Sequence, residues 1–73
     1  MIESNKRQKT KMIIENAMVE LLEHESFDQI STVKLTKTAG ISRSSFYTHY
    51  KDKYDMIEHY QQKLFHKLEY IFD

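Results

Sequence analysis

Residues 31–53 read STVKLTKTAGISRSSFYTHYKDK, and this stretch decides the fold. It contains the only glycine of the chain, Gly40, at a position where a helix has to end. Before it, Leu35 and Ala39 are four residues apart, so they share one face of a helix. After it, Ser42 is a good N-cap for a second helix. Two short helices joined by a turn that contains glycine are typical of the helix-turn-helix motif.

The second helix of this motif carries the side chains that would meet DNA. In helix-turn-helix proteins this helix lies in the major groove, and its first turns contact the bases. Ile41 and Phe46 have the spacing of a hydrophobic staple, which favours an inward-pointing Phe46. If Tyr50 also points inward, the remaining side chains of this helix are exposed: Arg43, Ser44, Ser45, Tyr47, Thr48 and His49.

Several short motifs occur together in and around this stretch. They are Ser31-Thr32-Val33, Ala39-Gly40-Ile41-Ser42, Phe46-Tyr47-Thr48-His49-Tyr50 and Lys53. Upstream lies the run Ile14-x-x-Ala17-Met18-Val19-x-Leu21-Leu22, which is followed by Phe27. Over roughly residues 8–68 the chain therefore resembles the DNA-binding head of the tetracycline-repressor (TetR/AcrR-like) family of bacterial transcriptional regulators.

The resemblance implies an all-α fold, in which a three-helix, homeodomain-like helix-turn-helix head is followed by the start of a longer fourth helix. We expect a flexible N-terminal arm over residues 1–5, the head over residues 6–53 with the motif at about 31–50, and helix 4 over residues 53–73. In the family a larger helical domain follows helix 4, binds the effector and makes the homodimer. We expect that domain to be absent from this chain, which would leave only weak self-association.

Composition agrees with a single small helical domain. The 73 residues include no cysteine, no proline and one glycine. Without cysteine, disulfides and thiolate metal sites are excluded. No apolar run reaches the roughly 18 residues that a membrane span needs. The N-terminus also lacks the apolar region of a signal peptide, so we expect a cytoplasmic protein with no membrane partner.

The formal net charge is zero, but the charges are segregated along the chain. Residues 1–11 contain four basic residues and one acidic residue, whereas residues 12–25 contain four acidic residues and no Lys or Arg. Residues 26–53, which include the motif, contain five basic and two acidic residues. This distribution suits an anionic partner that approaches from one side, such as double-stranded DNA. Ordinary solvated charge is an equally good interpretation of the pattern alone.

The first helix is predicted to begin at a capping box of Asn5 and Gln8 and to run to about Glu25. Its buried face is predicted as Ile14, Ala17, Met18, Leu21 and Leu22. Many relatives have a glycine where this chain has Ser26. If that residue must be left-handed, serine costs about 1 kcal/mol more than glycine. Thr36 replaces the usual alanine, and its hydroxyl is predicted to bond to the carbonyl of Thr32.

Base reading is predicted first for Arg43, whose fork matches the O6 and N7 atoms of guanine. Weaker candidates are Ser44, Ser45, His49 and Val33, and Val33 is as readily an ordinary half-exposed helix residue. The candidate phosphate contacts are Thr32, Ser42, Tyr47, Thr48, Lys51, Lys53, Lys6 and Arg7.

Three of these phosphate candidates have alternatives that stay open. Thr32 can serve as a second capping hydroxyl, and Tyr47 can lie half-buried along its helix. Lys53 follows Asp52, the predicted N-cap of helix 4, where a cation opposes the helix dipole. A phosphate partner would explain that lysine, and simple solvation is its alternative.

Helix 4 is predicted to pack through Ile57, Tyr60 and Leu64. Its later apolar face is a candidate self-association surface, comprising Leu64, Phe65, Leu68, Ile71 and Phe72. The rival to DNA binding is therefore a small helical protein-interaction module that uses this face. The chain has no Gly-rich phosphate loop and no nucleophile beside an evident base, so we expect no enzyme, no cofactor and no metal.

Overall fold

The computed structural model describes the backbone of residues 2–72 and the side chains of residues 6–66. In chain order its elements are α1 (Ile2–Leu22), the 3-10 helix η1 (Phe27–Gln29), α2 (Thr32–Ala39), α3 (Arg43–His49) and α4 (Lys53–Phe72). No strand occurs among the described residues. The prediction of an all-α head with a longer fourth helix is therefore confirmed.

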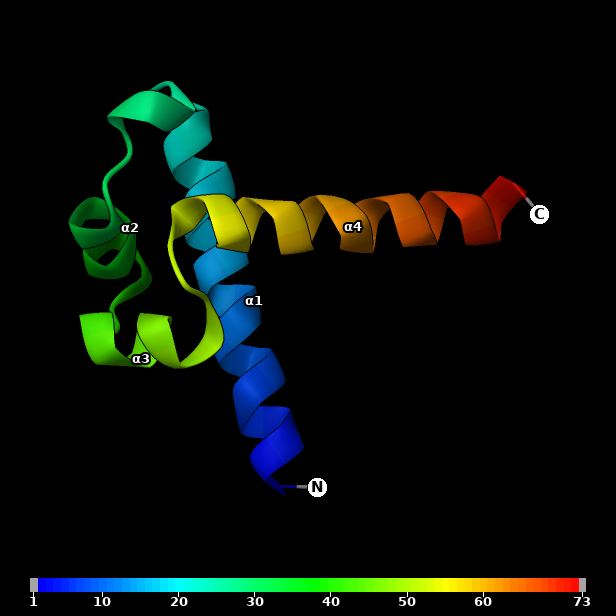
Figure 1. Cartoon of the computed structure of the whole chain (residues 1–73), viewed down its shortest axis with the longest axis horizontal. Helices are drawn as coiled ribbons and strands as arrows, with labels where there is room; N and C mark the ends of the chain where they lie inside the picture. Colours follow the sequence, from blue (N-terminus) through cyan, green and yellow to red (C-terminus); the bar gives the residue numbers. More distant parts are fainter. Residues whose placement is uncertain (1, 73) are drawn as a thin grey trace.

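The helices are arranged around α1 (Figure 1). α2 and α3 lie together on one side of it, whereas α4 crosses α1 near its middle and extends away from the other two. An ion pair of 3.1 Å between Lys63 and Glu15 joins α4 to α1. The helix-turn-helix pair is thus presented on one side of the molecule, opposite to the direction in which α4 leaves.

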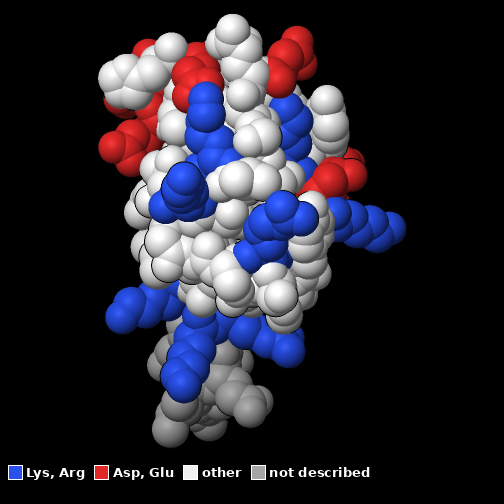
Figure 2. All heavy atoms as spheres, turned by 90° about the vertical axis from the view of Figure 1, so that its left-hand side faces the viewer, with Lys and Arg blue, Asp and Glu red and all other residues white. Residues whose placement is uncertain are grey.

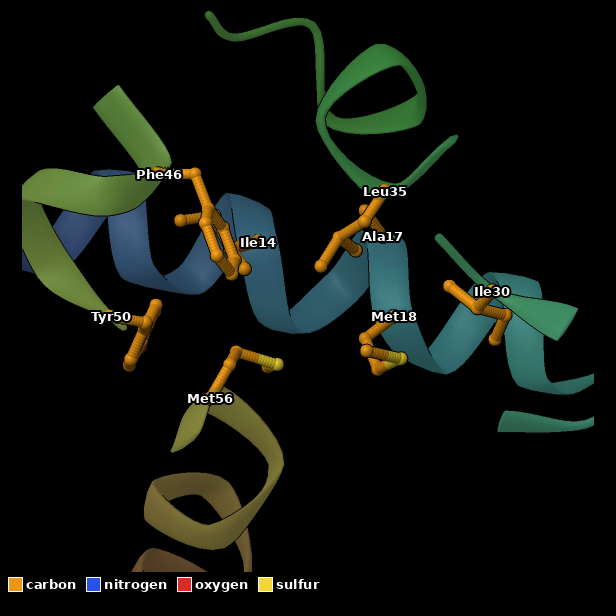
Figure 3. Close-up of a cluster of buried hydrophobic side chains, with 8 residues drawn as sticks. All are labelled: Ile14, Ala17, Met18, Ile30, Leu35, Phe46, Tyr50 and Met56. Carbon is orange, nitrogen blue, oxygen red and sulfur yellow. The ribbon is translucent and has the colours of Figure 1, made fainter. Parts of the chain in front are cut away.

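The core lies where the four helices meet (Figure 3). From α1 it takes Ile14, Ala17 and Met18, as the spacing of the apolar residues predicts. Leu21 packs partly against the core, but Leu22 is 39% exposed, so the prediction that it is buried is wrong. The other core members come from all the remaining parts of the head: Ile30, Leu35, Phe46, Tyr50 and Met56.

The buried position on α4 differs from the predicted one. Met56 is fully buried, whereas Ile57 and Tyr60 only pack partly against the core. Leu64, which is predicted to lie on the packed face, is 42% exposed. Helical spacing identifies an apolar side of α4, but Met56 is one residue away from the predicted stripe. The angle at which α4 meets α1 selects it, and that angle is a tertiary property.

The ends of α1 also differ from prediction. The helix begins at Ile2, so residues 2–5 are helical and Asn5 is not its N-cap. At the other end, the N–H groups of His24 and Glu25 both bond to the carbonyl of Leu21, at 3.0 and 2.9 Å. The last turn tightens in this way before the chain leaves the helix.

Ser26 does not adopt the left-handed conformation that would have favoured glycine. Its φ of −77° and ψ of 157° are extended, and its N–H donates to the side-chain oxygen of Gln29 at 3.3 Å. Among the described residues only Gly40 has a positive φ. The serine therefore causes no backbone strain at the start of η1.

The outer half of α4 is exposed where its side chains are described. Leu64 is 42% and Phe65 is 65% exposed, in agreement with an uncovered apolar face. The side chains of the other predicted members of that face, Leu68, Ile71 and Phe72, lie outside the described residues.

Candidate nucleic-acid interface

The turn between α2 and α3 is set by Gly40. Its φ of 72° and ψ of 31° are left-handed, and its N–H bonds back to the carbonyl of Lys37 at 3.2 Å. The N–H of Ile41 bonds to the carbonyl of Thr36 at 3.0 Å. These are the two bonds of a Schellman motif, which closes the C-terminal end of a helix. A Cβ built on Gly40 would meet nothing within 4 Å, so backbone conformation rather than lack of space requires glycine.

The predicted N-caps of α2, α3 and α4 are confirmed. The Ser31 hydroxyl accepts from the N–H of Lys34 at 3.0 Å, and the Ser42 hydroxyl accepts from the N–H of Ser45 at 3.1 Å. At the start of α4, the N–H of Asp55 donates to the Asp52 carboxylate at 2.8 Å. Side-chain caps therefore set the first residue of each helix in the motif and of α4.

α3 turns one face into the core and the other outward. Phe46 is fully buried and Tyr50 is 4% exposed, and their rings lie 5.7 Å apart. On the outer side Tyr47 is 51% exposed, and Arg43 is exposed at the first position of the helix. The ring of Tyr47 meets the edge of Phe46 at 5.4 Å, so its ring is anchored while its hydroxyl end is accessible.

The side-chain hydroxyls in and next to α3 differ in whether their proton is free to form a hydrogen bond with DNA. Thr48 donates its only hydroxyl proton to the carbonyl of Ser44 at 2.9 Å, and Ser42 donates to the hydroxyl of Ser45 at 3.1 Å. A phosphate oxygen can only accept a hydrogen bond, so Thr48 and Ser42 would first have to release these partners. The hydroxyls of Ser44, Ser45 and Tyr47 donate to no partner among the described residues, so they are the better candidates.

The first turn of α2 lies beside α3 in the motif. Thr32 is half-buried at its first position, and Val33 is 50% exposed. Thr36 is 4% exposed, and its hydroxyl donates to the carbonyl of Val33 at 3.1 Å. The prediction that this hydroxyl bonds to the carbonyl of Thr32 is therefore wrong by one residue. The Thr32 carbonyl does not accept from the Thr36 hydroxyl.

Basic side chains are distributed over the face that carries α2 and α3. Figure 2 shows Lys and Arg over the middle and lower part of this face, and Asp and Glu along its upper edge. One lysine of the motif is neutralised within the chain, because the Lys34 ammonium lies 2.6 Å from the Glu25 carboxylate. Lys37, Arg43 and Lys51 are exposed and have no ion-pair partner among the residues described.

α1 adds positive charge beside the end of α3. Burial lowers the pKa of His49 below its ordinary value of 6.5, and the positive charges of Lys11 and Arg7 lower it further. These two residues of α1 are therefore close to the last turn of α3. Arg7 is among the predicted phosphate contacts and Lys11 is not, although the spacing of four residues between them indicates a shared helical face.

Lys53 was predicted to offer its charge to a phosphate, but its ammonium is held within the chain. It donates to the carbonyl oxygens of Phe27 and Ile30, both at 2.8 Å, and to that of Asp28 at 3.4 Å. The prediction assumed an unpartnered cation at the start of α4. The contact with phosphate itself stays a prediction.

A groove of about 410 Å³ lies between α1 and α4, and Tyr50 at the end of the motif is one of its lining residues. Burial raises the pKa of Tyr50 to about 12, with smaller contributions from the charges of Glu15 and Asp55. None of the predicted DNA contacts lines it; its walls are Gln8, Lys11, Met12, Glu15, Tyr50, His59 and Lys63.

The described residues contain neither a metal site nor a membrane-spanning helix. No group of three His, Cys, Asp or Glu side chains there could hold a metal ion. No helix there is long and apolar enough to span a bilayer.

Comparison with known proteins identifies the family. A family model described as "Bacterial regulatory proteins, tetR family" matches residues 13–60, which is more than half of the chain. No curated protein and no solved structure matches the chain. The matched range runs from the first buried residues of α1, through the helix-turn-helix motif, to the packed turns of α4. The chain therefore belongs to the tetR family of bacterial regulatory proteins and contains its DNA-binding helix-turn-helix head.

Proposed function

We propose that this chain binds double-stranded DNA sequence-specifically, as the head of a transcriptional repressor, with α3 in the major groove. The observation that carries the proposal is the orientation of α3. Phe46 and Tyr50 anchor one face in the core, while Arg43 and Tyr47 project from a surface that also bears the basic residues of the motif. A helix fixed on one side and polar on the other suits insertion into a groove.

Arg43 is the proposed principal base contact. It occupies the first position of α3, directly after the Ser42 cap, and it has no partner among the described side chains. Its guanidinium can bond to guanine O6 and N7 together. Ser44, Ser45 and His49 follow on the same helix, and Val33 offers methyl groups to a thymine.

The proposed phosphate contacts lie around these residues. Tyr47 lies on α3 and Lys51 lies just after it. Thr32 lies at the start of α2, and Lys6 and Arg7 lie on α1. Ser42 and Thr48 can take part only if they give up their present hydrogen bonds. Such contacts orient the protein on the duplex but carry no base preference.

The full regulator is proposed to act as a cytoplasmic homodimer. Dimeric helix-turn-helix proteins read two half-sites about 34–36 Å apart, which the symmetry of the dimer determines. One head offers half of these contacts, so we expect a monomer to bind more weakly than a dimer.

Selection of bound sequences from a random duplex pool tests the proposal. We expect enrichment of a short motif that contains guanine. Affinity for the selected duplex should also fall steeply as salt rises, because bound lysines and arginines release counterions from DNA. Recovery of no motif, together with salt-independent binding, would refute it.

The alternative function is protein interaction through the outer half of α4. It is favoured by the exposure of Leu64 and Phe65, at 42% and 65%. We expect weak self-association, visible by sedimentation at rising concentration and abolished by Phe65→Glu. A strictly monomeric wild-type chain would argue against self-association.

A further inference from the structure

The contact between η1 and the first turn of α4 has a feature that DNA binding does not require. The Lys53 ammonium bonds to three carbonyl oxygens of the chain segment that joins α1 to α2. Two of these distances, to Phe27 and Ile30, are 2.8 Å, and the third, to Asp28, is 3.4 Å. An ammonium has three protons, so this arrangement uses all of its donors.

Aromatic rings complete the surroundings of this ammonium. It lies 4.6 Å from the ring centroid of Phe27 and 5.4 Å from that of Tyr54, within the range of cation–π attraction. The two rings meet edge to face at 5.2 Å. The lysine is only partly exposed. A phosphate could bind it only by displacing these carbonyls. That of Phe27 would still accept from the N–H of Ile30, whereas the Ile30 carbonyl would lose the one donor found for it among the described residues.

This geometry also explains why a lysine is tolerated at the start of α4. A cation opposes the dipole at that end of a helix, but it is favourable at the C-terminal end of another helical segment. The carbonyls that Lys53 reaches belong to η1 and to Ile30, which directly follows its last turn. The positive charge is thus neutralised by backbone dipoles 23 to 26 residues earlier in the chain.

The segment held by Lys53 leads directly into the proposed DNA surface. Ile30 precedes Ser31, the N-cap of α2, and Thr32 is the first residue of that helix. The placement of the Thr32 hydroxyl and N–H therefore depends on where Ile30 is held. Ile30 is itself fully buried, so a shift of its carbonyl is transmitted to its neighbours rather than absorbed by solvent.

We propose that Lys53 is a positioning residue for DNA binding: it fixes the start of α2 on the first turn of α4 and thereby places Thr32 against the phosphate backbone. The proposal rests on the proposed DNA-binding function for its consequence. We call the hydrogen bonds from the Lys53 ammonium to the carbonyls of Phe27, Asp28 and Ile30 the clamp. The existence of the clamp does not depend on the proposed function and can be tested in the free protein.

The first experiment measures amide hydrogen exchange without DNA in Lys53→Met. The N–H of Lys34, which bonds to the Ser31 cap, should lose protection by about tenfold, because α2 frays at the end that the clamp holds. The N–H of Ser45, which bonds to the Ser42 cap of α3, is the matched internal control and should change little. Equal losses at both amides, or none at either, would overturn the proposal.

The second experiment separates positioning from direct contact. Lys53→Met should weaken binding to a short duplex about tenfold without changing the salt slope. The matched variant Lys51→Met removes the same charge from an exposed side chain and should reduce the slope by about one. If Lys53→Met reduces the slope as Lys51→Met does, Lys53 binds phosphate directly and the proposal is wrong.

A double-mutant cycle tests whether the effect passes through Thr32. Lys53→Met should have little further effect on affinity in a Thr32→Ala background, because the group that it places is already absent. Additive losses would show that Lys53 stabilises the fold without placing Thr32, which also refutes the proposal.

If Lys53→Met does not fold, Lys53→Gln keeps a neutral amide donor and should give the same pattern with smaller factors. A wild-type chain that binds no duplex would refute the proposed function. The exchange experiment would still show whether the clamp holds the start of α2.

Discussion

The first turns of α4 and its outer half share a helical spacing of apolar residues but have opposite surroundings. In the first turns Met56 is fully buried and Lys53 is bonded to η1, whereas farther along Leu64 and Phe65 are 42% and 65% exposed. Both parts carry apolar residues at helical spacing. The spacing of apolar residues in the sequence therefore identifies an apolar face of a helix. Whether that face is covered depends on how far the neighbouring helices extend along it. Here α1 and η1 cover the first turns alone.

The largest expected effect tests this difference within α4 directly. Met56→Ala should lower the free energy of unfolding by about 2–5 kcal/mol, because it leaves a cavity among fully buried side chains. Leu64→Ala is the matched change on the exposed half and should cost no more than about 0.5–1 kcal/mol. Chemical denaturation of both variants provides the measurement. Similar losses would mean that the outer half is covered in solution.

A second prediction compares the DNA surface of the head with a basic residue farther along α4. Arg43→Ala should cost about 1–3 kcal/mol on the preferred duplex and relax the preference at one base pair. Lys63→Ala removes a positive charge that is paired with Glu15 and should leave base preference unchanged. Binding to a panel of single-base variants measures both. A uniform loss for Arg43→Ala would reassign this residue to the phosphate backbone.

A third prediction concerns the turn that holds the head together. Gly40→Ala should destabilise the fold by about 1–2 kcal/mol, because a residue with a Cβ is strained at its positive φ. Gly40→Asn should cost less, since asparagine adopts the left-handed region more readily. Gln61→Ala, at an exposed position of α4, is the control and should be nearly neutral in thermal unfolding. Equal stability of Gly40→Ala and wild type would contradict the left-handed turn.

The smallest expected effect is a pH dependence. The pKa of His49 is lowered in the folded chain, so the unfolded chain binds this proton more readily. Stability should therefore decrease as pH falls from above 6.5 through the lower folded-state pKa. Nearby phosphates would raise that pKa, so DNA affinity should instead increase as pH falls, by at most about tenfold per pH unit.

Titration of wild type, His49→Gln and His66→Gln checks both signs. His66 is exposed on the outer half of α4 and is the matched control. The pH dependence of DNA affinity should vanish in His49→Gln and persist in His66→Gln. Persistence in both variants would remove His49 from the interface.

The sequence by itself determined the helices of the head and their order. Gly40, Ser31, Ser42 and Asp52 end or begin helices through hydrogen bonds that span three to five residues, so their effect can be read without knowing the fold. The inward face of α3 was equally evident, because Phe46 and Tyr50 are the apolar positions one turn apart. The candidate DNA surface follows from these local features as the opposite side of the same helix.

Only the tertiary structure decided which groups meet across the chain. The choice of Met56 over Ile57 depends on how α4 crosses α1, and the proximity of Lys11 to His49 depends on how α1 lies beside α3. The partners of the Lys53 ammonium are carbonyls up to 26 residues away. Every residue has a carbonyl, so these backbone groups leave no mark in the amino-acid sequence, and only folding brings them to the lysine.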